Sequence, residues 1–286
     1  MLADLNIPWP QNDYTPLTTA QLAQLKNTII TAETLGYTHL AINFTVNIHE
    51  IKIPGNDINP IIKQLDNFEK LKEFTARGLK FFSRITLIIE NPNQGQNLSK
   101  FLGSFNILSI APTTEKALIL ACGNSDVDII TFDYSKRMNF YLKHKTVGGG
   151  VKKGIKFEIC YNSLVSSNSL EKQSFLTTFN NLVRVSRNQN LVISSGATSC
   201  LNLRNFNNVL TFCKNLGFRE NKVFKNTESV LLGATLKSKS YKQTVMIGEN
   251  PVHEDVTGKR NIKEIDSGDV FKEQLKRIKL NKQATK

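Results

Sequence analysis

The chain has 286 residues, of which 40% are hydrophobic and 21% are charged, a composition that can bury a core and excludes a largely disordered protein. Lys and Arg together number 37 against 24 Asp and Glu, which gives a formal net charge of +13. This surplus indicates a polyanionic partner, either a nucleic acid or an anionic membrane surface. The sequence contains no run of about 18 apolar residues, so we expect no membrane-spanning segment. Four cysteines without a CxxC pair argue against a zinc site and a disulfide framework.

Short apolar segments rich in Val, Ile and Phe alternate with segments of helical periodicity along residues 2–237. The predicted strands are 2–6, 38–44, 79–89, 105–112, 127–134, 155–161 and 191–196. The predicted helices are 18–35, 61–77, 97–103, 113–122, 169–188, 200–216 and 222–237. Strands that alternate with helices imply parallel pairing through right-handed crossovers. Seven such strands favour an α/β fold, a TIM-barrel-like parallel β/α barrel of regular or irregular form, with a doubly wound open sheet as the alternative.

The character of the sequence changes after about Gly248. Residues 249–286 carry few apolar anchors, and their mixed charge becomes basic toward the end. We therefore predict one barrel domain over 1–248, followed by a charged, largely disordered tail over 249–286 with a short helix near 270–280.

The carboxyl ends of the strands, where a parallel barrel places its catalytic residues, carry few groups suited to catalysis. These groups are Asp4, Asn6, Asn43, Arg84, Asp133, Glu158, Tyr161 and Ser195. The four histidines form no HxH, HExxH or HxxxH pattern, and Asp133 has no evident carboxylate partner. The glycine run 148–150 matches neither a P-loop nor a Rossmann fingerprint, and SSGA at 194–197 lacks the GxSxG pattern. We expect no catalytic residue, no metal site and no cofactor bound by this chain.

A block of cations with interleaved aromatic residues occupies 134–156, YSKRMNFYLKHKTVGGGVKKGIK. Cations neutralise phosphates, exposed aromatic rings stack on unpaired bases, and glycines allow a close approach to the backbone. For Phe140 and Tyr141 the sequence favours packing into the core over base stacking. A second basic pair, Arg184 and Arg187, shares a face near a predicted helix end, where RNA contact and helix-dipole complementarity fit equally well.

Arg84 interrupts the apolar run FFSRITLII, and a charge in such a strand must reach a barrel mouth or a partner. The sequence leaves open whether the partner is a phosphate or a buried carboxylate. The predicted RNA-contacting residues are Arg84, Lys136, Arg137, Lys143, His144, Lys145, Lys152, Lys153, Lys156, Arg184 and Arg187.

Five segments carry a family resemblance over roughly residues 1–240: DLNIPWPQN at 4–12, GYTHLAINFTVN at 36–47, GLKFFSRITLIIENPNQGQNL at 78–98, ITFDYS at 130–135 and ISSGATSCLNLRN at 193–205. In this order they resemble the barrel-forming, thirty-kilodalton-subunit family of eukaryotic nuclear RNase P and RNase MRP, in its fungal form. The resemblance implies a TIM-barrel-like fold related to the polymerase and histidinol phosphatase (PHP) phosphoesterases. Those enzymes carry an HxH metal motif on the first strand, where this sequence has Asp4-Leu5-Asn6. The resemblance therefore implies that the metal site is not built.

The resemblance further implies a non-catalytic subunit in the nucleus and nucleolus, bound to RNase P RNA and RNase MRP RNA and to no membrane. Its expected protein partners are a small RRM-like subunit, with which it forms a dimeric or tetrameric unit, and other RNase P/MRP proteins. The complex removes the 5′ leader from precursor tRNA and processes precursor rRNA, with Mg²⁺ expected at the RNA active site. Two alternatives are a degenerate PHP-type metal-dependent phosphoesterase and a protein-only assembly scaffold.

Overall fold

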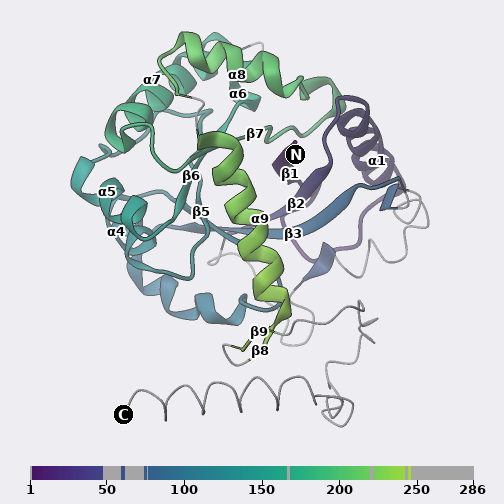
Figure 1. Ribbon diagram of the computed structural model, residues 1–286, viewed down its shortest axis with the longest axis horizontal. Coiled ribbons are helices and arrows are strands. Elements are labelled where there is room, and N and C mark those ends of the chain that lie inside the picture. The colour runs from purple at the N-terminus through teal and green to yellow at the C-terminus, as the bar shows by residue number, and fades with distance from the viewer. Residues whose placement is uncertain are drawn as a thin grey trace, which may run out of the picture. The chain divides into compact units, whose positions relative to one another are not determined.

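The computed structural model describes residues 2–47, 59–61, 74–75, 77–165, 168–219, 222–241 and 244–245, which lie in one compact unit, Met1–Val245. Seven parallel strands of this unit form one sheet in chain order (Figure 1). They are β1 Ala3–Pro8, β2 His39–Asn47, β3 Lys80–Ile89, β4 Ile107–Pro112, β5 Ile129–Ile130, β6 Lys156–Cys160 and β7 Leu191–Ser194. The predicted tail 249–286 and most of the predicted helix 61–77 lie outside the described residues.

The sheet curls so that the segment after β7 meets β1. Gly196 N donates to the carbonyl of Asn6 at 3.0 Å, and Ser195 N donates to Oδ1 of Asp4 at 3.0 Å. Ser195 Oγ adds a bond of 3.1 Å to the Asn6 carbonyl. These bonds bring the first and last strands together into a nearly closed barrel. The predicted parallel barrel is therefore confirmed over the open-sheet alternative.

Helices surround the strands (Figure 1). They are α1 Thr19–Thr34, α4 Glu115–Gly123, α5 His144–Lys152, α6 Asn162–Val165, α7 Ser169–Ser186, α8 Phe206–Asn215 and α9 Val223–Lys239, with 3-10 turns η1 Pro92–Lys100 and η2 Cys200–Asn202. A short hairpin, β8 Ser240–Tyr241 and β9 Thr244–Val245, follows α9.

Local sequence signals explain where these helices begin. Thr18 and Gln21 form a capping box at the start of α1, and Leu25, Ile29 and Ala32 make its buried face. The predicted helix 200–216 is instead two elements, because the chain is extended between η2 and the capping side chain of Asn205. The predicted helix 97–103 is the 3-10 turn η1, which begins earlier at Pro92.

The barrel has an apolar layer inside its amino-terminal end. Alternate strand residues point inward there, including Leu5, Phe82 and Ile129, and they form a cluster with Val230 and Leu231 of α9. Helix α9 is therefore packed across this mouth (Figure 1).

Two polar contacts tie α9 to the starts of two strands. Asn226 Nδ2 donates to the Leu191 carbonyl at 2.9 Å, and Lys237 Nζ lies 2.6 and 2.7 Å from the two carboxylate oxygens of Asp128. These contacts and the apolar cluster hold α9 across the amino-terminal mouth of the barrel.

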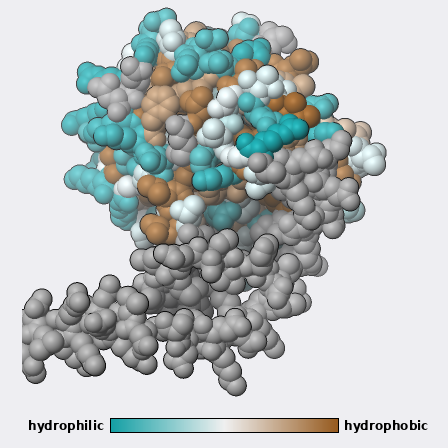
Figure 2. All heavy atoms as spheres, turned by 45° about the vertical axis from the view of Figure 1, so that its right-hand side comes forward, coloured by the Kyte–Doolittle hydropathy of each residue, from teal (hydrophilic) through white to brown (hydrophobic). Residues whose placement is uncertain are grey.

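Hydrophilic and apolar side chains are intermixed on the face shown in Figure 2. Several large apolar side chains of the described residues are exposed, among them Tyr141 and Leu201. No helix within the described part of the chain has the length and apolar character needed to cross a membrane.

Candidate functional site: a filled barrel centre and a basic surface

A buried ion pair between Arg84 of β3 and Glu158 of β6 occupies the centre of the barrel. Nη2 of Arg84 lies 2.6 Å from Oε2 of Glu158, and Nη1 contacts Oε1. The other guanidinium N–H groups face the Leu5 carbonyl at 2.8 Å, Ser109 Oγ at 2.9 Å and Thr86 Oγ1 at 3.3 Å. All five N–H donors of Arg84 therefore have an acceptor. Of the two partners that the sequence left open for Arg84, the structure selects the carboxylate.

Arg84 was predicted among the RNA-contacting cations, but its side chain is fully buried. Its charge is balanced inside the barrel. Burial acts to raise the pKa of Glu158, but the adjacent guanidinium and a hydrogen bond from Ser194 Oγ outweigh it, so this pKa lies below its usual range. The ionised pair is therefore a structural feature of the barrel centre, and Arg84 does not belong to the surface set.

A chain of side-chain hydrogen bonds extends this centre across four strands. Thr86 Oγ1 donates to Asn43 Oδ1 at 2.7 Å, and Asn43 Nδ2 donates to Asn6 Oδ1 at 2.8 Å. Asn6 Nδ2 then donates to Oε2 of Glu158 at 3.3 Å. The structure thus brings together Asn6, Asn43, Arg84 and Glu158, which the sequence placed on four different strands.

Asp4 lies beside this network on β1. Its Oδ1 accepts hydrogen bonds from the backbone N–H groups of Ser195 and Asn6, while Oδ2 is buried and has no hydrogen-bond partner among the described residues. Burial raises the pKa of Asp4 from its ordinary value of 3.8 to about 6. An isolated carboxylate in this place is costly, which explains the direction of the change.

The two remaining strand-end candidates lie apart from the network. Asp133 is exposed and accepts hydrogen bonds from the backbone and hydroxyl of Ser135. The hydroxyl of Tyr161 accepts a hydrogen bond of 3.2 Å from Arg204 N. Neither group faces Glu158 through a hydrogen bond in the described structure.

The polar centre does not fit a metal ion. The carboxylate of Glu158 is already bound by the guanidinium of Arg84, and that positive charge would repel a cation in the same space. Asn6 turns its amide N–H group, rather than an oxygen, toward Glu158. Within the described ranges, no group of three or more His, Cys, Asp or Glu residues is arranged to hold a metal.

The basic block 134–156 is divided between the two ends of the barrel. Lys136 and Arg137 are exposed in the loop that follows the carboxyl end of β5. Lys152, Lys153 and Lys156 lie at the other end, where α5 finishes and β6 begins. The block is contiguous in sequence but does not form one cluster in space.

Several cations of the block have partners within the protein. Lys143 Nζ lies 2.5 Å from a carboxylate oxygen of Glu115, and Lys153 Nζ donates to the Gly123 carbonyl. His144 Nδ1 donates to the Val185 carbonyl at 2.8 Å. Lys136 lies 3.8 Å from Asp133 in an exposed pair, a type that contributes little to stability.

The aromatic residues of the block differ in their placement. Tyr134 is buried and its hydroxyl donates to the Glu158 carbonyl, and Phe140 packs partly buried against the core. The predicted inward packing is therefore confirmed for Phe140. It is wrong for Tyr141, whose relative exposure is 84%.

One face of α5 combines exposed cations with an open backbone. Lys145, Gly148, Gly149 and Lys152 follow the spacing i, i+3, i+4 and i+7, which places them on the same side of the helix. Both lysines are exposed, and a Cβ atom at Gly149 would meet no heavy atom within 4 Å. An anionic chain can therefore approach this helix backbone closely between two positive charges.

The end of α7 lies next to α5. His144 at the start of α5 contacts Val185, and Asn190 Nδ2 donates to the carbonyl of Val151 at 2.9 Å. Arg184 and Arg187 are exposed at this end of α7, and Arg187 ends the helix in a left-handed conformation with φ of 55°. We call the exposed residues Lys145, Lys152, Arg184 and Arg187 the α5–α7 surface.

Sequence similarity to known proteins extends over most of this chain. The model of the family described as RNase P subunit p30 matches residues 1–239. The chain belongs to this family. It is 42% identical over 254 residues to ribonuclease P/MRP protein subunit RPP1 of Saccharomyces cerevisiae, a match that covers 87% of this chain and 85% of that protein. It is 30% identical to the probable ribonuclease P protein subunit 3 of Schizosaccharomyces pombe, over 85% of this chain and 97% of the relative.

A solved structure shares the fold of this p30-family chain. One chain of the cryo-EM structure of archaeal ribonuclease P with mature tRNA aligns with a TM-score of 0.62 and 16% identity. The alignment covers 79% of this chain and 96% of the archaeal one. At that identity the likeness establishes a common fold.

Two features of the p30-family barrel escaped the sequence analysis. The pairing of Arg84 with Glu158 depends on strands far apart in the sequence, although the alternation Lys156, Glu158, Cys160 signals three inward polar positions on β6. The position of α9 in the barrel mouth has no local signal, because a helix packed outside a barrel shows the same periodicity.

Proposed function

We propose that this chain is a non-catalytic, RNA-binding protein subunit of the RNase P and RNase MRP ribonucleoproteins. The observation that carries the proposal is the family match over residues 1–239, together with relatives that are named as ribonuclease P or P/MRP subunits. In this role the chain supports removal of the 5′ leader from precursor tRNA and the processing of precursor rRNA. Phosphodiester cleavage is assigned to the RNA component with its Mg²⁺ ions, and this chain binds no cofactor of its own.

The α5–α7 surface is the proposed RNA-contacting region. Its four exposed cations supply charge for phosphate oxygens, and the open backbone at Gly149 admits a phosphate close to the helix. Contacts of this kind recognise backbone and shape rather than base sequence. Lys136, Arg137 and the exposed ring of Tyr141 add a second contact region at the carboxyl ends of the strands, where the ring is available for stacking on an unpaired base.

The proposed partners are RNase P RNA, RNase MRP RNA, precursor tRNA in the assembled complex, a small RRM-like subunit and the other RNase P/MRP proteins. The chain enters the complex in one or two copies, and the complex resides in the nucleus and nucleolus. The carboxylate of Glu158 is paired with Arg84 and is therefore not free to bind a metal ion, which disfavours the alternative of a metal-dependent phosphoesterase. The pull-down experiment distinguishes the other alternative, a protein-only scaffold, from the main proposal.

The test is a pull-down of the tagged chain from nuclear extract, with and without nuclease treatment, followed by sequencing of the retained RNA. We expect the RNase P and MRP RNAs together with their protein subunits. Recovery of the proteins with no specific RNA contact, measured by crosslinking in the same sample, would support a scaffold instead. Recovery of neither RNA nor these subunits would overturn the proposal, and phosphatase assays with added metal would follow.

A further inference from the structure

Lys156 is a largely buried residue whose amino group has no partner among the described residues. It opens β6 and belongs to the inward-pointing series that continues with Glu158 and Cys160. Its relative exposure is 8%, and no hydrogen bond or ion pair reaches its amino group from any described residue. Burial lowers the pKa of Lys156. The amino group is not among the fully buried, unpartnered polar atoms of the described residues, so it reaches solvent through an opening in the surface and is accessible to an anion.

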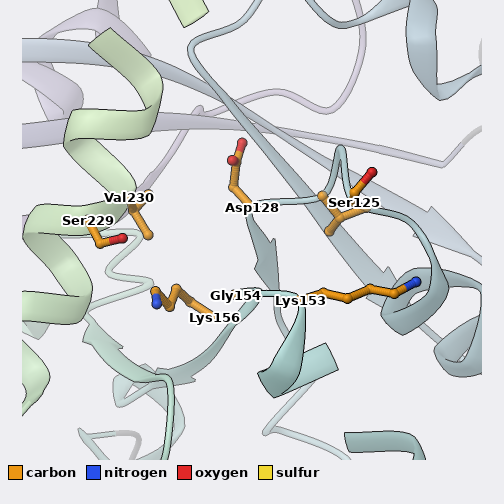
Figure 3. Close-up of a pocket in the computed structure, with 8 residues that line it drawn as sticks. Ser125, Asp128, Lys153, Gly154, Lys156, Ser229 and Val230 are labelled. Atoms are coloured by element: carbon orange, nitrogen blue, oxygen red, sulfur yellow. The ribbon is translucent and has the colours of Figure 1, made fainter. Parts of the chain in front are cut away.

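The amino group of Lys156 points into a small pocket between the barrel mouth and α9 (Figure 3). The pocket has a volume of about 130 Å³. Its lining consists of Ser125, Val127, Asp128, Lys153, Gly154, Lys156, Ser229 and Val230. Figure 3 shows the end of the Lys156 side chain directed toward Ser229 and Val230, whereas Lys153 extends away from it.

The acid in this pocket does not neutralise Lys156. Both carboxylate oxygens of Asp128 contact Lys237 Nζ, at 2.6 and 2.7 Å, and Oδ2 also accepts a hydrogen bond from Leu108 N at 2.9 Å. Lys153 is held by the Gly123 carbonyl. The lining therefore carries two lysines, Lys153 and Lys156, and its one carboxylate is paired with Lys237, which lies outside the lining.

We propose that this pocket binds a single phosphate group, with Lys156 as its principal cation. The amino group of Lys156 supplies the ion pair, and Ser229, toward which it is directed, supplies a hydroxyl group as hydrogen-bond donor. The volume is well below the ~300 Å³ at which pockets begin to hold whole drug-sized ligands, so the site admits a phosphate but not a nucleoside.

A bound phosphate would connect α9 to the barrel. Ser229 belongs to α9, whereas Lys156 belongs to β6 and Ser125 to the turn before β5. The phosphate has two possible sources, the backbone of an RNA or a small phosphorylated molecule. The RNA source rests on the proposed function, but binding of inorganic phosphate does not.

The first experiment measures the thermal unfolding midpoint of the full chain in inorganic phosphate and in chloride at equal ionic strength. The variants are Lys156→Met, which keeps the aliphatic stem, and Ser229→Asp, which places a carboxylate at the exposed wall. Lys172→Met, at an exposed lysine of α7 outside the pocket and outside the α5–α7 surface, is the matched control. Phosphate is expected to raise the midpoint of the wild type and the control by roughly 2–4 °C, and to leave both pocket variants unchanged. Ser229→Asp keeps the test valid if Lys156→Met folds poorly, because Ser229 is exposed.

The second experiment identifies the source of the bound phosphate by measuring RNA affinity in the assembled ribonucleoprotein over a range of salt concentrations. If an RNA phosphate fills the pocket, Lys156→Met lowers the log–log salt slope of RNA affinity by about 0.7, the value for one single-strand contact. If Lys156→Met loses the thermal response to phosphate but keeps the salt slope of the wild type, the pocket binds a small phosphorylated ligand. The phosphate site would be overturned if phosphate and chloride gave the wild type the same unfolding midpoint and Lys156→Met left the salt slope of RNA affinity unchanged. A chain that binds no RNA at all would instead refute the proposed function.

Discussion

Arg84 and Glu158 face each other inside the barrel, with 2.6 Å between Nη2 and Oε2 and no exposed surface on either residue. Replacing one partner of such a pair leaves the other charge buried without compensation, which typically costs about 3–5 kcal/mol. We expect Glu158→Gln to lower the free energy of unfolding by that amount in a denaturant titration. Glu115→Gln, which breaks the exposed pair with Lys143, is the control and should cost about 0–1 kcal/mol. A loss below about 1 kcal/mol in Glu158→Gln would contradict this account.

The buried carboxyl group of Asp4 makes the stability of the barrel depend on pH. Its pKa in the folded protein is about 6, above the ordinary 3.8, because burial disfavours the charged form. The folded state therefore binds more protons than the unfolded state between these values, and the contribution of Asp4 to stability falls as pH rises from about 4 to about 6. The difference corresponds to on the order of 3 kcal/mol at 1.36 kcal/mol per pH unit.

Asp4→Asn tests this dependence, because the amide oxygen still accepts the bonds from Ser195 and Asn6. We expect the stability of this variant, relative to the wild type, to be greater at pH 7 than at pH 4. Unfolding titrations at the two pH values measure the difference, with the exposed substitution Asp133→Asn as control. Parallel pH profiles for wild type and Asp4→Asn would refute the assignment.

The sequence predicted the barrel better than it predicted the site. Alternation of strands and helices identifies the fold because it depends on local periodicity. The cations of 134–156 are contiguous in sequence, yet the chain passes there from the carboxyl end of β5 to the amino end of β6. Neighbours in sequence thus lie at opposite ends of the barrel. The partner of Arg84 is 74 residues away, at Glu158, so no local pattern could identify it.

Helix α9 offers a direct test of packing across the amino-terminal mouth. Leu231 is 5% exposed within the interior cluster, whereas its neighbour Leu232 is 56% exposed. We expect Leu231→Ala to cost about 2–5 kcal/mol in unfolding free energy, because it removes buried methyl groups and leaves a cavity. Leu232→Ala should change stability by less than about 0.5 kcal/mol. Equal effects in the two variants would show that α9 does not fill the barrel mouth.

The α5–α7 surface predicts a salt-dependent loss of RNA affinity. Lys145→Met together with Lys152→Met should weaken RNA binding by the assembled ribonucleoprotein and lower its log–log salt slope by roughly 1.4, at 0.7 per phosphate. Lys143→Met is the control, because Lys143 is paired with Glu115 at 2.5 Å. A filter-binding titration over a range of salt concentrations measures both quantities. An unchanged slope in the double variant would remove this surface from the RNA interface.

Substitutions at two adjacent glycines of α5, Gly149 and Gly150, distinguish effects on stability from effects on RNA binding. A Cβ at Gly149 meets no heavy atom within 4 Å, so Gly149→Ala should stabilise the helix by about 0.5–1 kcal/mol. The added methyl group would nevertheless stand where a phosphate approaches the backbone, so RNA affinity should fall as stability rises.

Gly150→Ala is the matched comparison, because its Cβ would lie 3.2 Å from Cys122 Sγ and from Phe157 Cζ. Both neighbours are buried, so crowding of about 1–3 kcal/mol opposes the gain in helix propensity and makes this variant less stable than Gly149→Ala. Thermal unfolding and RNA titration of the two variants separate the effects. If Gly149→Ala gains stability and keeps full RNA affinity, the open backbone of α5 plays no part in binding, and the contacts of this surface are made by its side chains alone.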